Sequence, residues 1–164
     1  MSEKIILLNA EKCTGCRRCE LVCSFAKEKI FNPAQSRIRL LRIKESEKTV
    51  PIVCQQCVTP LCTYVCPTKA ITKDEETGLV THDPDLCIGC LMCFVACPIG
   101  GISINPETRK PIKCDLCGGD PKCVSECEYG AIEFVDLDEA NEKKREEAIR
   151  NIDDLLKIIT ERKE

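Results

Sequence analysis

The sequence predicts an α+β fold of small modules, made of short hairpins and short helices, with one longer helix at the C-terminus. Three observations support this prediction. The 16 cysteines of the 164-residue chain fall into four sets of four, with none left over. In the segments that separate the cysteine sets, apolar residues alternate with polar ones, which favours strands. After residue 135 the chain contains no cysteine, glycine or proline and is dense in charge, which favours a helix.

The four cysteine sets follow one spacing plan. The first and third have gaps of two, two and three residues, the run typical of bacterial ferredoxins; they are Cys13, Cys16, Cys19, Cys23 and Cys87, Cys90, Cys93, Cys97. The second has gaps of two, four and three (Cys54, Cys57, Cys62, Cys66), and the fourth has gaps of two, five and three (Cys114, Cys117, Cys123, Cys127).

This spacing suits a 4Fe-4S cluster, because three thiolates on one tight loop can reach three irons. In two-cluster ferredoxins the fourth thiolate ligates the other cluster. We therefore expect four 4Fe-4S clusters, with each fourth cysteine at the start of a helix and bound to the cluster of a partner set.

Two other uses of the cysteines compete with clusters. A framework of eight disulfides is typical of secreted chains much shorter than this one. Structural zinc would normally show two close pairs separated by a longer loop. Triplets followed by a lone fourth cysteine recur four times here, so both alternatives are disfavoured.

The residue after each fourth cysteine indicates which sets share a module. Pro67 and Pro98 follow the inner sets, whereas Ser24 and Glu128 follow the outer ones. We expect nested ferredoxin-like modules: an outer one from residues 1–50 and 107–135, an inner one from residues 51–106, and a C-terminal helix over 136–164. The 20 residues between sets two and three leave room for a short helix and a hairpin.

Nesting predicts four ligand groups: Cys13, Cys16, Cys19 with Cys127; Cys114, Cys117, Cys123 with Cys23; Cys54, Cys57, Cys62 with Cys97; and Cys87, Cys90, Cys93 with Cys66. A sequential pairing of set one with two and set three with four stays open.

Glycines mark the expected cluster loops. Gly15 and Gly89 each precede the second cysteine of a set, where a residue without Cβ allows positive φ and close approach of the backbone to the cluster. Gly118 and Gly119 are expected to let the longer gap of the fourth set fold around its cluster. The lone histidine, His82, is expected at the surface or beside a cluster site.

A weak repeat follows the fourth cysteines. Isoleucine stands five positions later in three sets, at Ile71, Ile102 and Ile132, while Glu28 replaces it in the first set. We expect a short helical turn entering a strand at each isoleucine. With 4% aromatic residues and no tryptophan, the clusters themselves are expected to form the inner scaffold, so that folding depends on their assembly.

Two further elements are predicted by periodicity. Alternation over residues 37–43 and 49–53 predicts a hairpin across 44–48, with arginines that either face solvent or dock an acidic partner. An apolar stripe at helical spacing runs along the C-terminal helix and packs either on the chain itself or on another subunit; its members are Ala148, Ile149, Ile152, Leu155, Leu156 and Ile159.

Charge and hydropathy argue against nucleic-acid binding, membrane insertion and secretion. The formal charge is −3, and four clusters would add roughly −8, so nucleic acid is not an expected partner. No apolar run reaches the roughly 18 residues of a membrane span, so no direct membrane insertion is expected. The N-terminus lacks the apolar region of a signal peptide. A cytoplasmic location is expected, although export alongside a partner's leader stays open.

Taken together, these motifs resemble the four-cluster ferredoxin-like subunits of molybdenum and tungsten pterin oxidoreductases. That family includes the iron-sulfur subunits of dimethyl sulfoxide reductase and formate dehydrogenase. The specific marks are the order of the four spacings, the Asn32-Pro33 to Arg39 segment and Cys97-Pro98. The compact length and short fourth set look closest to the small subunit accompanying tungsten aldehyde oxidoreductases.

The resemblance implies a non-catalytic electron-transfer subunit. Its partners would be a catalytic pterin-metal oxidoreductase subunit and, as acceptor, a soluble ferredoxin or another redox subunit. Alternatives are an electron-transfer subunit of a hydrogenase, a formate dehydrogenase or a carbon monoxide dehydrogenase, or a free-standing polyferredoxin. An iron-sulfur regulator would need an effector domain that the sequence does not suggest.

Overall fold

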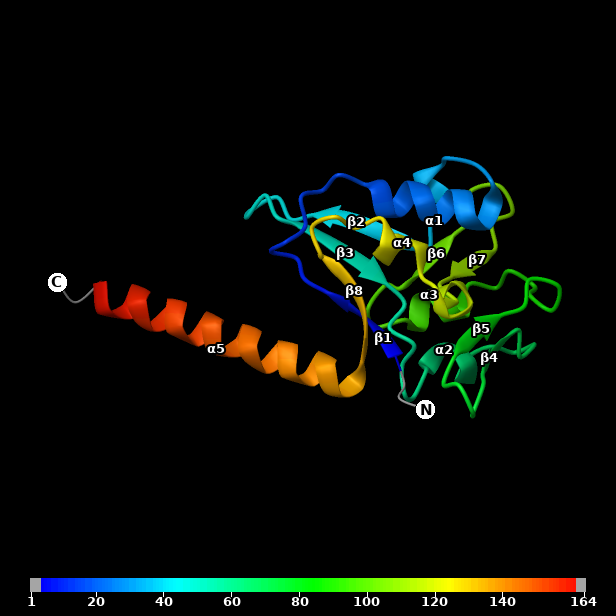
Figure 1. The fold of residues 1–164 in the computed structure, drawn as a ribbon. Coiled ribbons are helices and arrows are strands. Elements are labelled where there is room, and N and C mark those ends of the chain that lie inside the picture. The colour runs from blue at the N-terminus through cyan, green and yellow to red at the C-terminus, as the bar shows by residue number, and fades with distance from the viewer. Residues whose placement is uncertain (1–3, 162–164) are drawn as a thin grey trace.

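The computed structural model describes residues 4–161. In this part of the chain, strands pair only as two-stranded antiparallel sheets, and short helices pack around them. One long helix, α5, projects from this body (Figure 1). The chain therefore has the mixed α/β, ferredoxin-like character expected from the sequence, with a C-terminal helix.

The strands form four pairs along the described chain. The pairs are β1 (Lys4–Leu8) with β8 (Ile132–Asp136), β2 (Ile38–Arg42) with β3 (Thr49–Val53), β4 (Ile71–Lys73) with β5 (Val80–His82), and β6 (Ile102–Ile104) with β7 (Pro111–Lys113). The β2–β3 hairpin confirms the prediction from alternation over residues 37–53. The β4–β5 hairpin lies between sets two and three, as predicted. The β1–β8 pair joins the two ends of the cysteine-bearing region.

The short helices lie close to the cysteines. They are α1 (Arg18–Glu28), η1 (Pro33–Gln35), α2 (Leu61–Tyr64), α3 (Met92–Ala96), η2 (Leu116–Gly119) and α4 (Lys122–Ser125). In each set an α-helix begins just before the third cysteine, so the prediction that a helix begins at the fourth cysteine is wrong.

Prolines mark the starts of α2 and α4 and the ends of the helices in the two inner sets. Pro60 and Pro121 immediately precede α2 and α4 with φ of −80° and −67°, values that suit the start of a helix. Pro67 and Pro98 follow the fourth cysteines. Because proline cannot continue a helix, the fourth cysteine of the two inner sets comes after the helix or at its last turn.

The repeat after the fourth cysteines forms one recurring turn. The amide N–H groups of Lys69, Gly100 and Gly130 each donate to the carbonyl of the fourth cysteine three residues earlier, at 3.2–3.3 Å. All three residues have positive φ, and each of them ends the turn shortly before a strand begins. The strands β4, β6 and β8 do begin at Ile71, Ile102 and Ile132, as predicted.

The buried core consists of aliphatic side chains and cysteines. One cluster contains Ile6, Ile38 and Val53 with cysteines of sets one, two and four. A second contains Ile71, Val80 and Ile102 with Cys62 and Cys93. The core therefore surrounds the cysteine loops, in keeping with the low aromatic content.

The helix α5 (Leu137–Glu161) packs against the body near its start. Ala140 is buried, and Lys143 forms an ion pair with Glu133 of β8. Further along, Ile149 and Ile152 are 67% and 57% exposed. The alternative that the predicted stripe packs on the chain itself is therefore wrong at these two positions. The side chains of Leu155, Leu156 and Ile159 lie outside the described residues.

None of the helices within residues 4–161 combines the length and the apolar composition that crossing a membrane requires.

Candidate iron-sulfur sites

The four cysteine loops share one backbone conformation. In every set the residue before the second cysteine has positive φ: Gly15 (72°), Gln56 (47°), Gly89 (74°) and Leu116 (55°). The sequence predicted this for the two glycines but not for Gln56 or Leu116, whose only signal was their equivalent offset. Non-glycine residues in this conformation are strained, so the surrounding structure must hold the loops in shape.

The cysteines gather into four sites, each made of three cysteines of one set and the fourth cysteine of another. Site A consists of Cys13, Cys16, Cys19 and Cys127, which line one small cavity. Site B consists of Cys23, Cys114, Cys117 and Cys123, which line a second. Site D consists of Cys66, Cys87, Cys90 and Cys93, which line a third. Site C consists of Cys54, Cys57, Cys62 and Cys97. The other three cysteines of this site lie close enough to Cys62 for their negative charge to raise its pKa.

Several of these thiols are protonated unless a metal binds them. The pKa of Cys19 and of Cys114 is raised to about 12 and that of Cys62 to about 11, and burial is the largest cause in each case. It also raises the pKa of Cys93 and Cys123. A coordinating metal deprotonates a thiol outright, so loading these sites must release protons.

Backbone amides point at sulfur atoms in several sites. The N–H groups of Arg37, Gly101 and Leu116 donate to the sulfurs of Cys23, Cys97 and Cys114, at 3.3, 3.3 and 3.4 Å. At Cys66 burial opposes ionisation, but amide hydrogen bonds, led by that of Ile71, lower the pKa of the thiol. Donors of this kind stabilise thiolates and tune the potential of a bound cluster.

Contacts between cysteines link site A to site B, site B to site C, and site C to site D. Helix α1 carries Cys19 of site A and Cys23 of site B, one helical turn apart. Cys114 of site B lies close enough to Cys54 of site C that their charges interact. Cys62 of site C and Cys93 of site D share one buried cluster. Sites A and D stand at the ends, and each contains one exposed cysteine, Cys16 and Cys90.

The geometry disfavours mononuclear zinc. A structural zinc ion holds four sulfur atoms at roughly 2.3 Å around one point. Within residues 4–161, no three cysteine, histidine or carboxylate side chains converge closely enough to hold a single metal ion. In sites A, B and D, four cysteines line one small cavity, which is the set of ligands that a 4Fe-4S cluster requires.

His82 lies beside site D. Its side chain lines the site D cavity, and its Nε2 atom is buried without a hydrogen-bond partner in the described structure. Burial, chiefly, lowers the pKa of His82, so the ring is neutral near pH 7. The position agrees with the prediction of a residue beside a cluster site.

Gly101 has a role that the sequence did not predict. It stands where β6 passes the start of set two, and a Cβ there would lie 2.7 Å from the Cα of Cys54. The close approach is tertiary, so no local pattern signalled it.

Comparison with known proteins identifies the family. The model of the 4Fe-4S dicluster domain matches residues 46–137, more than half of the chain. The chain belongs to the 4Fe-4S dicluster domain family. Multiple 4Fe-4S clusters are therefore its cofactors. The cysteines that line the small cavities are the type of ligand that such clusters need.

Several relatives of this dicluster-domain protein are oxidoreductase subunits by name. It is 42% identical over 132 residues to the polyferredoxin-like subunit of the aliphatic sulfonate oxidoreductase of Pyrococcus furiosus, covering 77% of this chain and 76% of the relative. It is 33% identical over 156 residues to the B subunit of the anaerobic dimethyl sulfoxide reductase of Escherichia coli K12, covering 83% of this chain and 75% of the relative.

A third relative is much longer. The chain is 37% identical to subunit beta of the NADH-dependent phenylglyoxylate dehydrogenase of Aromatoleum evansii, covering 79% of this chain but only 30% of that subunit. The dicluster-domain region therefore corresponds to part of a larger subunit in that protein.

Proposed function

We propose that this chain is an iron-sulfur electron-transfer subunit that passes single electrons along sites A, B, C and D and performs no catalysis itself. The observation that carries the proposal is the row of four cysteine sites with an exposed cysteine at each end. When bound, 4Fe-4S clusters supply one-electron carriers. The chain's own residues hold the carriers in order, shield the middle of the row and leave both ends open to partners.

The proposed ligands are the four nested groups. The cavities lined by the cysteines of sites A, B and D, and the interaction of Cys97 with the second set, support this assignment over sequential pairing. On this proposal the outer module comprises residues 1–50 and 107–135, and the inner module comprises residues 51–106. Positive φ at Gly15, Gly89, Gly118 and Gly119 supports their role as loop residues around the clusters.

The proposed partner is a catalytic oxidoreductase subunit. The named relatives support this, because each is a subunit of an oxidoreductase by its printed name. We assign a molybdenum or tungsten pterin subunit of the aldehyde-oxidising type, on the sequence resemblance. A soluble ferredoxin or a further redox subunit is the proposed acceptor, and a cytoplasmic location is proposed for the complex.

The apolar stripe of α5, which is exposed at Ala148, Ile149 and Ile152, is assigned to the contact with that catalytic subunit. Ile149 and Ile152 face away from the described body, and the helix projects well beyond it (Figure 1). A free shuttle would gain nothing from such a helix, whereas a permanent subunit can bury it.

Anaerobic purification from native extract tests the proposal. We expect a stoichiometric larger subunit carrying a pterin or another redox cofactor, together with spectroscopic signals of reducible 4Fe-4S clusters. Isolation as a lone monomer with the same clusters would instead indicate a free-standing polyferredoxin. Isolation with catalytic turnover and no partner would contradict the non-catalytic assignment.

A further inference from the structure

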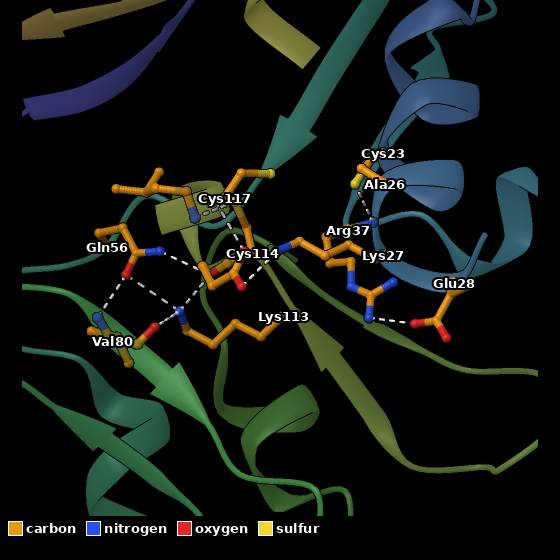
Figure 2. A network of polar contacts seen from close by, with 12 residues as sticks. Cys23, Ala26, Lys27, Glu28, Arg37, Gln56, Val80, Lys113, Cys114 and Cys117 are labelled. Atoms are coloured by element: carbon orange, nitrogen blue, oxygen red, sulfur yellow. Dashed lines mark hydrogen bonds and ion pairs between the residues drawn. The ribbon is translucent and has the colours of Figure 1, made fainter. Parts of the chain in front are cut away.

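Lys113 places a buried positive charge in the middle of the row of sites. It ends β7, directly before Cys114, and is only 7% exposed. Its Nζ group donates to the carbonyl oxygens of Val80 and Cys114 and to Oε1 of Gln56 (Figure 2). All three acceptors are neutral oxygens.

Gln56 completes this network. It lies between Cys54 and Cys57 in the loop of site C and is 5% exposed. Its Nε2 group donates to the Cys114 carbonyl at 2.8 Å, and its Oε1 also accepts from the Val80 amide at 2.8 Å. The network therefore joins the loop of site C, strand β5 and Cys114 of site B, as Figure 2 shows.

Lys113 differs from the other partly buried basic residues nearby. Lys27 pairs with Asp115 at 2.6 Å and Arg37 pairs with Glu28 at 2.5 Å. Among the residues that the structure describes, no carboxylate lies within ion-pair distance of Lys113. The carboxylates that line the same cavity as Lys113 stay outside that distance, and a buried charge without a close countercharge is costly.

Cysteine thiolates are the anions within its reach. At Cys62 and Cys114 burial, chiefly, raises the thiol pKa, and the charge of Lys113 opposes the rise at both. These two cysteines belong to sites C and B, on either side of the network. Lys113 Nζ also lies 3.0 Å from the Cys114 carbonyl and 3.3 Å from Gln56 in the loop of site C, so its charge acts on both middle sites.

We propose that Lys113 raises the reduction potentials of the clusters at sites B and C, so that electrons on the row are favoured at its middle. This inference rests on the proposed function. Each reduction adds one electron, supplied in the test by dithionite, with no bond made or broken and no proton transferred. A fixed positive charge in a buried, low-dielectric position favours the more negative, reduced form.

The test is an anaerobic redox titration of the full chain followed by electron paramagnetic resonance. Lys113→Met should make two of the four clusters harder to reduce, by at least tenfold in the one-electron equilibrium, which corresponds to about 59 mV. Lys113→Arg keeps the charge and should restore most of the shift. Lys110→Met is the matched control, because Lys110 is a lysine nearby in sequence whose Nζ donates to the Pro84 carbonyl outside this network.

Gln56→Glu provides a second route if Lys113→Met loses iron. The new carboxylate would keep both accepting contacts of Oε1, would lose the donor contact of Nε2 to the Cys114 carbonyl, and would partly neutralise Lys113. The same two potentials should therefore fall. Unchanged potentials in an iron-replete variant, or an equal shift of all four clusters, would overturn the inference. Absence of 4Fe-4S signals from the wild-type chain would instead overturn the proposed function.

Discussion

Replacement of Gly101 by alanine probes the packing of the inner sites. A Cβ at this position would lie 2.7 Å from the Cα, and 2.8 Å from the backbone nitrogen, of Cys54. Cβ atoms in proteins essentially never lie within 3.0 Å of such a neighbour, and ordinary van der Waals contact begins at 3.4 Å. The backbone of Cys54 would therefore have to move by about 0.7 Å, and it cannot rotate away as a flexible side chain would.

The expected cost follows from this displacement. Overpacking of a well-packed interior typically costs about 1–3 kcal/mol, and we expect the upper end because the clash is with backbone atoms. Cys54 begins the loop of site C, and the Gly101 amide donates to the sulfur of Cys97 at the same site. Gly101→Ala should therefore lower the iron and acid-labile sulfide content by about one cluster and lower the midpoint of anaerobic urea unfolding.

Gly100→Ala is the matched control. No atom lies within 4 Å of a Cβ at Gly100, whose φ is +64°. The substitution should cost only the strain of a left-handed residue, roughly 1–2 kcal/mol, and should leave the iron content unchanged. Full iron content in Gly101→Ala with a wild-type unfolding midpoint, or greater damage from Gly100→Ala, would refute the reasoning.

Three other outcomes follow from the structure. Deletion of residues 148–164 keeps the contacts of Ala140 and Lys143, so it should preserve iron while weakening copurification with the catalytic subunit; undiminished copurification would rule out docking through α5. Glu20→Gln removes a buried carboxylate next to Cys19 and should raise the potential of the site A cluster in a redox titration, on the order of 59 mV or less; a fall would contradict this expectation. Removal of iron with a chelator under anaerobic conditions should abolish most of the circular dichroism signal and expose the thiols to alkylation; retention of native structure would show that the clusters are not the scaffold.

Local sequence patterns predicted most of the cysteine chemistry. The spacing of the sets, and the residues following the fourth cysteines, are local features that follow directly from the covalent chain. Alternation predicted the β2–β3 hairpin, and the absence of glycine and proline after Val135 predicted α5. The turn residues Gly15 and Gly89 were recognisable because positive φ favours glycine.

Features that depend on tertiary contacts could not be predicted in this way. Gln56 and Leu116 adopt positive φ only because their loops are held by the rest of the structure. The burial of Lys113 depends on β5 and the loop of site C, which are distant in sequence. The starts of α2 and α4 have a local signal in Pro60 and Pro121, whereas α1 and α3 follow Arg17 and Leu91, which carry no such signal.

The composition of the anaerobically purified full chain tests the four-cluster row most directly. We predict about sixteen iron and about sixteen acid-labile sulfide atoms per chain, no stoichiometric zinc, and magnetic coupling among reduced clusters, as expected for neighbouring sites in a row. Stoichiometric zinc without sulfide, or a chain that stays colourless and gives no paramagnetic signal on reduction, would contradict this prediction.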